Sequence, residues 1–358
     1  MKISLVYKDA LGGGGYPRDV RWLASALANL GAHVILLCQE PADEAVTEGL
    51  SRDVCIESFD NIRNIKADIY HVFGIFMPGQ LWQVRQVLDR PLVVSPMGHL
   101  MPFHLKRNPF KKVAYLQIVK PLLKRVRWFH VFSGVEANSV HYHLGYRVST
   151  FEAGLGVFPP PSNVELKKGN REHDALHLLF FGRNDIFQKG VDILLQGFAH
   201  AVRQGSRAFL TIAGQPWLYS EQYIRSFIEK NHLSGRIHVL GPVDENTKWK
   251  LLNEADYLVF LSRWDGPPRP IREAIAVGTP VIVSPETNMG RLVSEFNAGI
   301  ETSLDPEKVA RAILHVETDR SMWIEHRAGV LRLRERLDWS RVAEDYLQGY
   351  DQVLASWK

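Results

Sequence analysis

The sequence predicts an α/β protein of two doubly wound domains. Three observations carry this prediction: the chain length, an alternation of strands and helices that occurs twice, and a proline-rich break between the two series. At 358 residues the chain is too long for one ordinary hydrophobic core. The break at 158–174 reads FPPPSNVELKKGNREHD, a linker composition without periodicity. We therefore predict an N-terminal domain over 1–162, a linker over 163–175 and a C-terminal domain over 176–340.

The first series of elements opens with the apolar run Ile3–Tyr7, which leads into the glycine tract Gly12–Gly15. Apolar residues then recur at helical spacing from Val20 to Ala28, and Val34–Leu37 form the next run. Strand, glycine loop, helix and strand in this order open a parallel α/β sheet. Further strands of this sheet are predicted at Ile69–Val72, Leu92–Val94 and His130–Phe132.

The second series restarts after the break with a strand at Leu176–Phe181, a turn at Gly182 and a helical face from Val191 to Val202. In doubly wound domains, ligands bind where the carboxyl ends of the strands meet, and we expect that cleft between the two domains. The remaining strands are predicted at Phe209–Ala213, Ile237–Leu240, Tyr257–Leu261 and Pro280–Val283.

The composition is that of an ordinary globular protein, with 46% hydrophobic and 23% charged residues. Two cysteines, Cys38 and Cys55, are too few for a disulfide framework and favour a reducing compartment. Met1 leads directly into a strand without a leader sequence, and no apolar run approaches the roughly 20 residues of a membrane-spanning helix. We therefore expect a cytoplasmic protein.

The modest net charge of +4 hides an uneven distribution, because residues 90–135 contain no acidic side chain. Such a stretch, interleaved with apolar residues, suits an anionic membrane surface, nucleic-acid phosphates or a solvated helix face. No helix-turn-helix, zinc or RNA-binding signature accompanies it, so we expect no nucleic acid as a partner. Peripheral binding at the inner membrane face and a solvated helix face both remain open. The basic residues are Lys106, Arg107, Lys111, Lys112, Lys120, Lys124, Arg125 and Arg127.

Two cations flank the loop between the first strand and the first helix of the C-terminal domain, in FFGRNDIFQKGVDILLQGF. Arg183 and Lys189, together with the unpaired N–H groups of the helix N-terminus, are suited to a diphosphate. The alternative is that they are ordinary surface cations.

Two carboxylates stand in LSRWDGPPRPIREAIAVGTPVIVS, with seven residues between them. Pro270 suits the first turn of a helix that ends at Gly278, which places Glu273 in that first turn, facing the cleft. Asp265 lies on the preceding loop. Carboxylates accept hydrogen bonds from vicinal hydroxyls, so the pair can hold a ribose and a sugar. Alternatively, Glu273 only complements the helix dipole, an effect of about 0.3–1 kcal/mol.

Seven ordered segments together resemble the retaining glycosyltransferases of family 4, and the likeness covers nearly the whole chain. The resemblance implies the GT-B fold, two Rossmann-like doubly wound domains with an interdomain cleft, and a C-terminal helix over 341–358 that packs back toward the N-terminal domain. The segments are GGYPRDVRWLASALANLGAHV, DIYHVFG, PLVVSPMGHL, the phosphate segment, IHVLGPV, LVFLSRWDGPPRPIREAIAVGTPVI and the terminal LDWSRVAEDYLQGYDQVL.

The resemblance implies a role for each matching residue. Arg183 and Lys189 would grip the donor diphosphate, Glu273 would bind the ribose and Asp265 the transferred sugar. In the turn where the family often has histidine, this chain has Met97, and whether His99 replaces it is left open. Backbone contacts to the donor are implied for Gly14, Gly15, Val243, Asn288, Met289 and Gly290.

The implied function is transfer of a hexose from a nucleotide-diphosphate sugar to a glycan or lipid-linked acceptor, in cell-surface polysaccharide assembly. The resemblance also implies that the reaction retains the anomeric configuration and needs no metal or other cofactor. A catalytically silent, sugar-nucleotide-binding GT-B protein is the alternative, because Pro267, Pro268 and Pro270 all lack an N–H donor. A nicotinamide-dependent oxidoreductase is disfavoured, since the glycine tract lacks the third glycine of GxGxxG.

Overall fold

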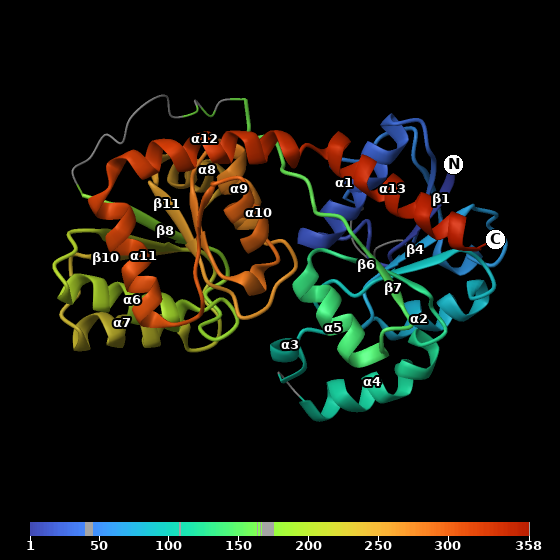
Figure 1. Ribbon diagram of the computed structural model, residues 1–358, viewed down its shortest axis with the longest axis horizontal. Helices are drawn as coiled ribbons and strands as arrows, with labels where there is room; N and C mark the ends of the chain where they lie inside the picture. Colours follow the sequence, from blue (N-terminus) through green and yellow to red (C-terminus); the bar gives the residue numbers. More distant parts are fainter. Residues whose placement is uncertain (40–45, 107–108, 163, 165, 167–174, 358) are drawn as a thin grey trace. The chain divides into compact units, whose positions relative to one another are not determined.

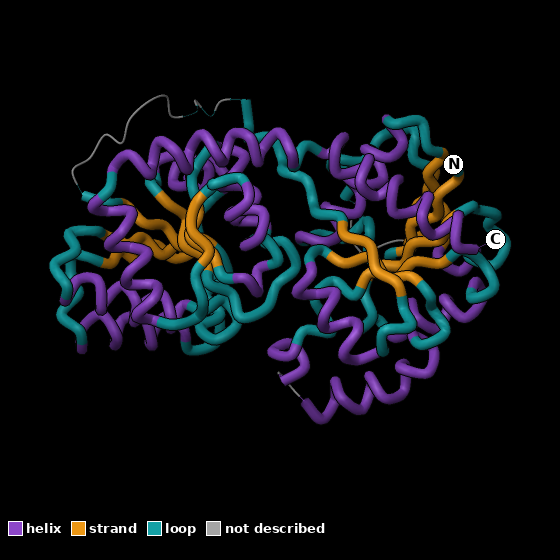
Figure 2. The backbone as a smooth tube through the Cα atoms, viewed as in Figure 1, coloured by secondary structure: helices purple, strands orange, loops and turns teal. Residues whose placement is uncertain are grey.

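The computed structural model describes residues 1–39, 46–106, 109–162, 164, 166 and 175–357. It divides into two compact units, one of Met1–Gly156 with Leu337–Lys358 and one of Val157–Arg336 (Figure 1). Each unit is a parallel sheet with helices on both faces (Figure 2). The units therefore divide a few residues before the predicted ends of the two domains, 162 and 340. The predicted linker falls largely outside the described residues.

The sheet of the N-terminal unit has the strand order β3-β2-β1-β4-β5-β6-β7. Every strand predicted from an apolar run is present within one to two residues, whereas β3 and β7 were not predicted. Both are edge strands: all four residues of β3 are exposed, and Phe151 is the one buried residue of β7. The strands are β1 (Lys2–Val6), β2 (His33–Cys38), β3 (Cys55–Ser58), β4 (Ile69–Phe73), β5 (Leu92–Ser95), β6 (Trp128–Val131) and β7 (Ser149–Glu152).

Helices of the N-terminal unit cover both faces of this sheet, with α1 and α13 on one side and α2, α4 and α5 on the other (Figure 1). The helix predicted after the glycine tract is α1, which buries Val20, Leu23, Ala24 and Leu27. No helix among the described residues is long and apolar enough to cross a membrane. The helices are α1 (Gly15–Asn29), α2 (Pro78–Val84), α3 (Pro102–Lys106), α4 (Pro109–Leu123), α5 (Gly134–Leu144) and α13 (Trp339–Trp357), with 3₁₀ turns at Phe59–Asn61 and Arg85–Val87.

The C-terminal helix α13 is part of the core of the N-terminal unit. His71, at the centre of β4, is fully buried and hydrogen-bonded through Nδ1 to the Tyr350 hydroxyl (2.7 Å) and through Nε2 to Ser95 Oγ (2.6 Å). At Gly349, an added Cβ would lie 2.3 Å from the Phe151 ring. His71 is thus a core residue that fixes α13 to the sheet.

The sheet of the C-terminal unit has the strand order β10-β9-β8-β11-β12-β13. Counted within the unit, this is the order 3-2-1-4-5-6 that is typical of a doubly wound fold. All predicted strands are present, and the short edge strand β13 was missed. The strands are β8 (His177–Phe181), β9 (Phe209–Ala213), β10 (Ile237–Gly241), β11 (Tyr257–Phe260), β12 (Val281–Val283) and β13 (Gly299–Glu301). The helices are α6 (Val191–Arg203), α7 (Ser220–Lys230), α8 (Glu245–Glu254), α9 (Arg269–Val277), α10 (Gly290–Glu295), α11 (Pro306–Thr318) and α12 (Arg320–Arg336), with a 3₁₀ turn at Pro285–Thr287.

Candidate active site

Arg183 follows β8 on the loop that leads to α6. Its guanidinium lies over the Trp217 ring, 4.4 Å from the centroid, and its Nη2 donates to Gln188 Oε1 at 2.8 Å. The side chain is 39% exposed, so part of the guanidinium remains open to a ligand. The loop thus holds a cation at the carboxyl end of β8, where the fold places ligands.

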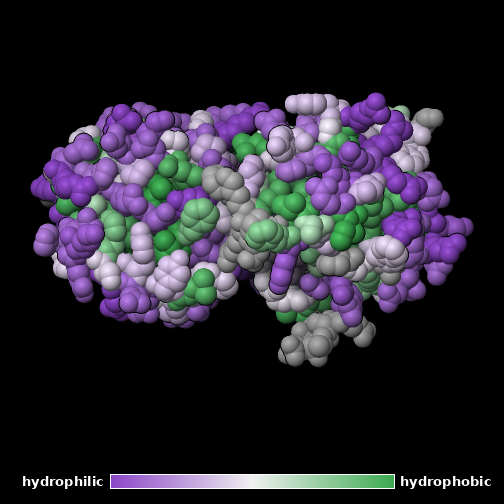
Figure 3. All heavy atoms as spheres, turned by 90° about the horizontal axis from the view of Figure 1, so that it is seen from below, coloured by the Kyte–Doolittle hydropathy of each residue, from purple (hydrophilic) through white to green (hydrophobic). Residues whose placement is uncertain are grey.

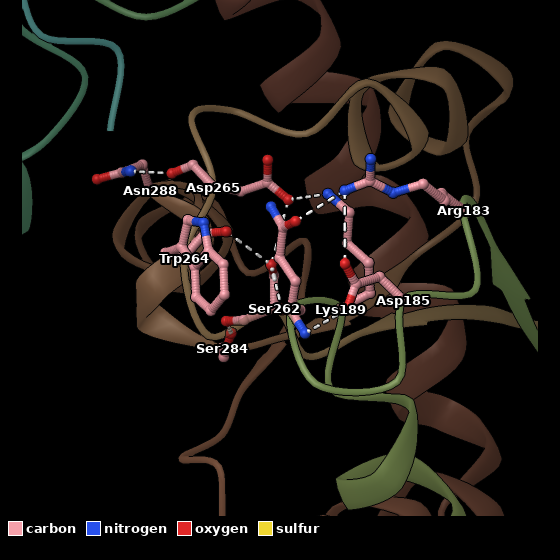
Figure 4. Close-up of polar contacts among 9 residues, drawn as sticks. Arg183, Asp185, Lys189, Ser262, Trp264, Asp265, Ser284 and Asn288 are labelled. Atoms are coloured by element: carbon pink, nitrogen blue, oxygen red, sulfur yellow. Dashed lines mark hydrogen bonds and ion pairs between the residues drawn. The ribbon is translucent and has the colours of Figure 1, made fainter. Parts of the chain in front are cut away.

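Lys189 and Asp265 form an ion pair between Lys189 Nζ and Asp265 Oδ2 (Figure 4). Ser262 Oγ lies 3.2 Å from the same carboxylate oxygen and also donates to the Gln188 carbonyl at 2.9 Å. The two side chains are 14% and 17% exposed. Residues predicted separately for the phosphate and for the sugar are therefore in contact, although 76 positions separate them.

A second ion pair, which the sequence analysis did not predict, fixes the loop after β11 to helix α6. Arg263 on the loop after β11 binds both oxygens of Asp192, in the first turn of α6, at 2.8 and 2.7 Å. Two parallel N–H···O bonds define the geometry of such a pair as well as its energy. Arg263 therefore ties the Asp265 loop to the start of α6, next to Lys189. An arginine two positions before Asp265 is the only sign of it in the sequence.

Glu273 lies deeper than predicted. Helix α9 begins at Arg269, with Pro270 at its second position, so Glu273 falls in the second turn and the first turn contains no acidic residue. Its side chain is 2% exposed, and Oε1 accepts hydrogen bonds from Lys248 Nζ (2.8 Å) and Arg269 Nε (2.9 Å). The prediction that Glu273 lies in the first turn is wrong. The alternative that Glu273 only complements the helix dipole is wrong for the same reason, because that effect is confined to the first turn.

Lys248 is the second residue that the sequence analysis missed. It comes from α8 and is 4% exposed, and it also binds Glu245 Oε1 at 2.6 Å. A buried lysine requires compensation of its charge, which Glu273 supplies. Its spacing of four from the buried Leu252 was the available signal that it faces inward.

The residues predicted to offer backbone groups fall into two sets. In the C-terminal unit, Asn288 has a positive φ of 59°, and its side-chain amide donates to the Asp265 carbonyl. The Met289 N–H donates to Thr287 Oγ1 at 3.3 Å, so it is already engaged. Gly290 begins α10, and an added Cβ would lie 2.5 Å from Glu301 Oε2. Val243 is half-buried between β10 and α8.

Gly14, Gly15 and His99 belong to the N-terminal unit. Gly14 precedes α1 with a φ of 116°, which only glycine adopts readily, and a Cβ at Gly15 would meet no atom within 4 Å. An open backbone at a helix N-terminus is consistent with the predicted approach of a phosphate. The contacts predicted for these residues with the donor, and the predicted interdomain cleft, remain predictions.

His99 lies in an aromatic cluster. Its ring stacks on His104 with the centroids 5.1 Å apart and meets Phe76 edge-on at 5.5 Å. Burial, followed by the charges of His104 and Lys112, lowers the pKa of His99 to about 3, so the ring is neutral near pH 7. Its Nδ1 is placed 3.4 Å from the Ile75 N–H.

Met97 and Gly98 form the turn before His99, with φ values of 58° and 75°. The buried Glu136 carboxylate accepts hydrogen bonds from the N–H groups of Gly98 and Phe132, and burial raises the pKa of Glu136 to about 7. The turn is therefore held by a side chain from α5. Among the described residues, no group of three or more His, Cys, Asp or Glu is placed to hold a metal, and metal independence stays a prediction.

Comparisons with known proteins identify the chemistry of the C-terminal unit. Residues 163–330 match the family model "Glycosyl transferases group 1". A GDP-mannose:cellobiosyl-diphosphopolyprenol alpha-mannosyltransferase of Xanthomonas oryzae pv. oryzae is 24% identical over 311 residues, covering 82% of this chain and 76% of that protein.

Solved structures share the whole architecture at low sequence identity. Sucrose-phosphate synthase from Thermosynechococcus elongatus has a TM-score of 0.73 at 19% identity over 99% of both chains. Anabaena Alr3699/HepE, solved in complex with UDP and glucose, has a TM-score of 0.68 at 17% identity over 98% of this chain and 100% of that one. The two Rossmann-like sheets, the match of residues 163–330 to the glycosyl transferases group 1 model and the mannosyltransferase relatives together identify the protein as a glycosyltransferase with the GT-B fold.

Proposed function

We propose that this glycosyltransferase moves a hexose from a nucleoside-diphosphate sugar to a glycan carried on a lipid diphosphate, as a retaining enzyme of family 4. The observation that carries the donor half is the Lys189–Asp265 pair beside Arg183, because it joins phosphate-binding and hydroxyl-binding groups in one place. The acceptor half is supported by the relatives, whose names specify GDP-mannose and cellobiosyl-diphosphopolyprenol.

The proposed chemistry breaks the bond between the anomeric carbon and the donor diphosphate. Positive charge develops on the anomeric carbon, and negative charge develops on the leaving diphosphate. Arg183 and Lys189 stabilise the leaving group, which is electrostatic catalysis by fixed cations and requires no metal ion. Lys189 has three N–H donors, so it can keep its bond to Asp265 and still bind a phosphate oxygen.

Retention follows if the acceptor hydroxyl attacks the face from which the diphosphate departs. The departing phosphate oxygen then takes the hydroxyl proton, and the new glycosidic bond forms as the old one breaks. Asp265 accepts a hydrogen bond from a sugar hydroxyl and acts as a positioning group. Its carboxylate is paired with Lys189 and lies 3.2 Å from Ser262 Oγ, an arrangement that suits orientation better than nucleophilic attack.

We further propose that the protein acts in cell-surface polysaccharide assembly at the inner membrane face, bound peripherally through α4. On this helix Phe110 and Ile118 are 91% and 75% exposed, and Lys111 is exposed beside them. Apolar residues that protrude from a basic face are typical of helices that lie on anionic membranes. Figure 3 views the molecule from the side on which α4 lies and shows hydrophobic side chains among hydrophilic ones there.

A silent nucleotide-sugar-binding protein is the second candidate, favoured by the three prolines around the start of α9. Transfer to a synthetic disaccharide on a lipid diphosphate distinguishes the two, with GDP-mannose and the UDP-hexoses as donors. We expect product formation that resists EDTA, with an anomeric configuration equal to that of the donor. Donor binding without product for any of these donors would support the silent protein instead, and an inverted product would exclude the retaining mechanism.

A further inference from the structure

A groove in the N-terminal unit runs between α2 and α4 and has a volume of about 400 Å³. Its floor is the hydrophobic core under the two helices, where Leu81 and Val119 are buried. Its walls carry Trp82 from α2 and Ile118 from α4, which are 67% and 75% exposed. The groove is therefore an apolar surface that stays in contact with solvent.

Among the residues that the structure describes, the charged side chains that line the groove are Arg85 and Arg125, and none is acidic. In the sequence, residues 90–135 contain no acidic side chain. The Arg85 guanidinium carbon lies 4.2 Å from the centroid of the Trp82 ring, a cation–π contact that holds the side chain at the groove. The planar guanidinium of arginine is suited to phosphate oxygens. The groove thus offers an apolar bed bordered by two phosphate-binding side chains.

Trp82 also lines a second hollow, of about 740 Å³, at the carboxyl ends of the first three strands. This hollow is polar where the groove is apolar: Lys8, Gln39, Glu57 and Asp60 line it. Carboxylate, amide and ammonium groups beside an exposed indole are the chemistry that binds sugar hydroxyls and sugar faces. Trp82 lines both the polar hollow and the apolar groove, so the two surfaces meet at this indole, and Arg85 and Arg125 belong to the groove.

We infer that this composite surface binds the lipid-diphosphate acceptor itself, with the glycan in the hollow, the diphosphate at Arg85 and Arg125, and the first part of the lipid chain in the α2–α4 groove. The inference rests on the proposed function, since it names where the proposed acceptor binds. A lipid-linked glycan combines the three groups that the joined surfaces suit: a glycan for the polar hollow, and a diphosphate and an apolar chain for the arginine-lined groove. A phospholipid headgroup would use the arginines and the groove but leave the sugar-binding hollow empty.

The binding test uses farnesyl diphosphate as the probe, with farnesol and inorganic pyrophosphate as its two halves, measured by titration calorimetry on the full-length protein. We expect farnesyl diphosphate to bind at least tenfold more tightly than either half. Trp82→Ala and Arg125→Gln should each weaken it about tenfold, which corresponds to about 1.4 kcal/mol. The matched controls are Lys124→Gln, which changes an exposed cation next to Arg125, and Val113→Ala, which changes an exposed apolar residue of α4. Neither residue is among those that line the groove.

Three outcomes would overturn the assignment: equal affinity for pyrophosphate and farnesyl diphosphate, an equal loss with Lys124→Gln, or equally effective competition by dioctanoyl phosphatidylglycerol. The last would make the groove a site for membrane lipids.

A transfer assay separates this inference from the function. Arg125→Gln should raise KM for the lipid-linked disaccharide and leave KM for the free disaccharide unchanged, whereas Trp82→Ala should raise both, because its ring also lines the hollow. If wild type transfers to the lipid-linked disaccharide and the groove variants do so equally well, the groove is wrong and the function stands. If wild type transfers nothing, the function fails, and the titration still decides what the groove binds.

Discussion

At the scale of single residues, the buried Glu273 carboxylate provides the sharpest test of the donor site. Lys248 and Arg269 both bind its Oε1, so Oε2 is the oxygen that would face a ribose. The probe is GDP, the nucleotide in the names of the mannosyltransferase relatives, or UDP if wild type binds UDP instead. With GDP as the probe, Glu273→Gln should weaken binding about tenfold or more, since a charge-assisted hydrogen bond contributes about 1.5–3 kcal/mol. It should change the binding of 2′,3′-dideoxy-GDP much less, because that ligand lacks the hydroxyls.

Lys248→Met tests the same site by removing the lysine that pairs with Glu273. Removing Lys248 leaves the buried Glu273 carboxylate with only the half-buried Arg269 as its partner, and weakening the compensation of a buried charge is destabilising. The loss of GDP affinity should therefore accompany a lower melting temperature of the C-terminal unit. Glu245→Gln is the control, since Glu245 also binds Lys248 but is 60% exposed. An equal loss of GDP and dideoxy-GDP in Glu273→Gln would contradict the ribose role.

The buried histidines of the N-terminal unit give its stability a defined pH dependence. Burial lowers the pKa of His130 to about 4 and that of His99 to about 3, and it lowers the pKa of His71 well below the usual 6.5. Between pH 4 and 6.5 the unfolded chain binds protons at these sites that the folded chain does not, so stability rises with pH. Glu136, with its pKa raised to about 7, has the opposite slope between 4.5 and 7 and offsets one histidine.

We therefore expect the denaturant midpoint of the N-terminal unit to increase from pH 4.5 to 6.5 and then to level off. Glu136→Gln should make the increase steeper, because it removes the opposing titration. A midpoint that falls over this interval in wild type would show that the histidines are not buried in their neutral form.

The sequence allowed candidate site residues to be named, but it did not reveal most of their contacts, and their roles remain predictions. Arg183, Lys189 and Asp265 were identified from local motifs, and the structure brings Lys189 and Asp265 together. Lys248 and Arg263 were missed because their importance depends on partners 25 and 71 positions away. Local patterns do not report such long-range pairs.

At the scale of elements, apolar runs located the central strands because both faces of a parallel sheet are buried. The edge strands β3, β7 and β13 lack such runs and were missed. Pro270 lies in the first turn of α9 as predicted, but the helix begins one residue earlier, at Arg269. Glu273 is therefore the fifth helical residue and falls just beyond the first turn.

Helix α4 and the segment that follows it, up to Arg127, carry the prediction of membrane binding. Lys111→Gln, Lys124→Gln and Arg127→Gln together should release the protein from anionic vesicles, because each cation contributes about 1 kcal/mol near such a surface. These three side chains are exposed, whereas Lys112 binds the His104 carbonyl at 2.8 Å and Arg107 lies outside the described residues. The measurement is co-sedimentation with vesicles of increasing phosphatidylglycerol content at low and moderate salt.

A matched control for the charge change is Arg203→Gln, Arg207→Gln and Lys230→Gln, three exposed cations of the C-terminal unit. This triple variant should sediment like wild type. If wild type stays in solution with anionic vesicles even at low salt, the α4 face is only a solvated helix face.

At the scale of the whole molecule, the two units have separate hydrophobic cores, and the chain's last helix belongs to the first unit. Doubly wound topology was predictable because strand and helix alternate in order twice, with a polar break between the series. The role of α13 in the core was not predictable from periodicity, since it depends on buried contacts with β4 and β7. Glycine at 349 is the residue that allows this close approach.

Gly349→Leu should therefore destabilise one unit and spare the other. The Cβ of the new leucine would lie only 2.3 Å from the Phe151 ring. Overpacking a core in this way lowers the free energy of unfolding by about 1–3 kcal/mol. In calorimetry we expect one transition to fall by about 2–4 °C for each kcal/mol lost, while the other stays in place. GDP should raise only the transition that stays, because the proposed donor site lies in the C-terminal unit. Gln348→Leu, which adds the same side chain at the exposed neighbouring position, should leave both transitions near their wild-type temperatures. If both transitions fell together in Gly349→Leu, α13 would support the folding of both units, and its assignment to the N-terminal core alone would be wrong.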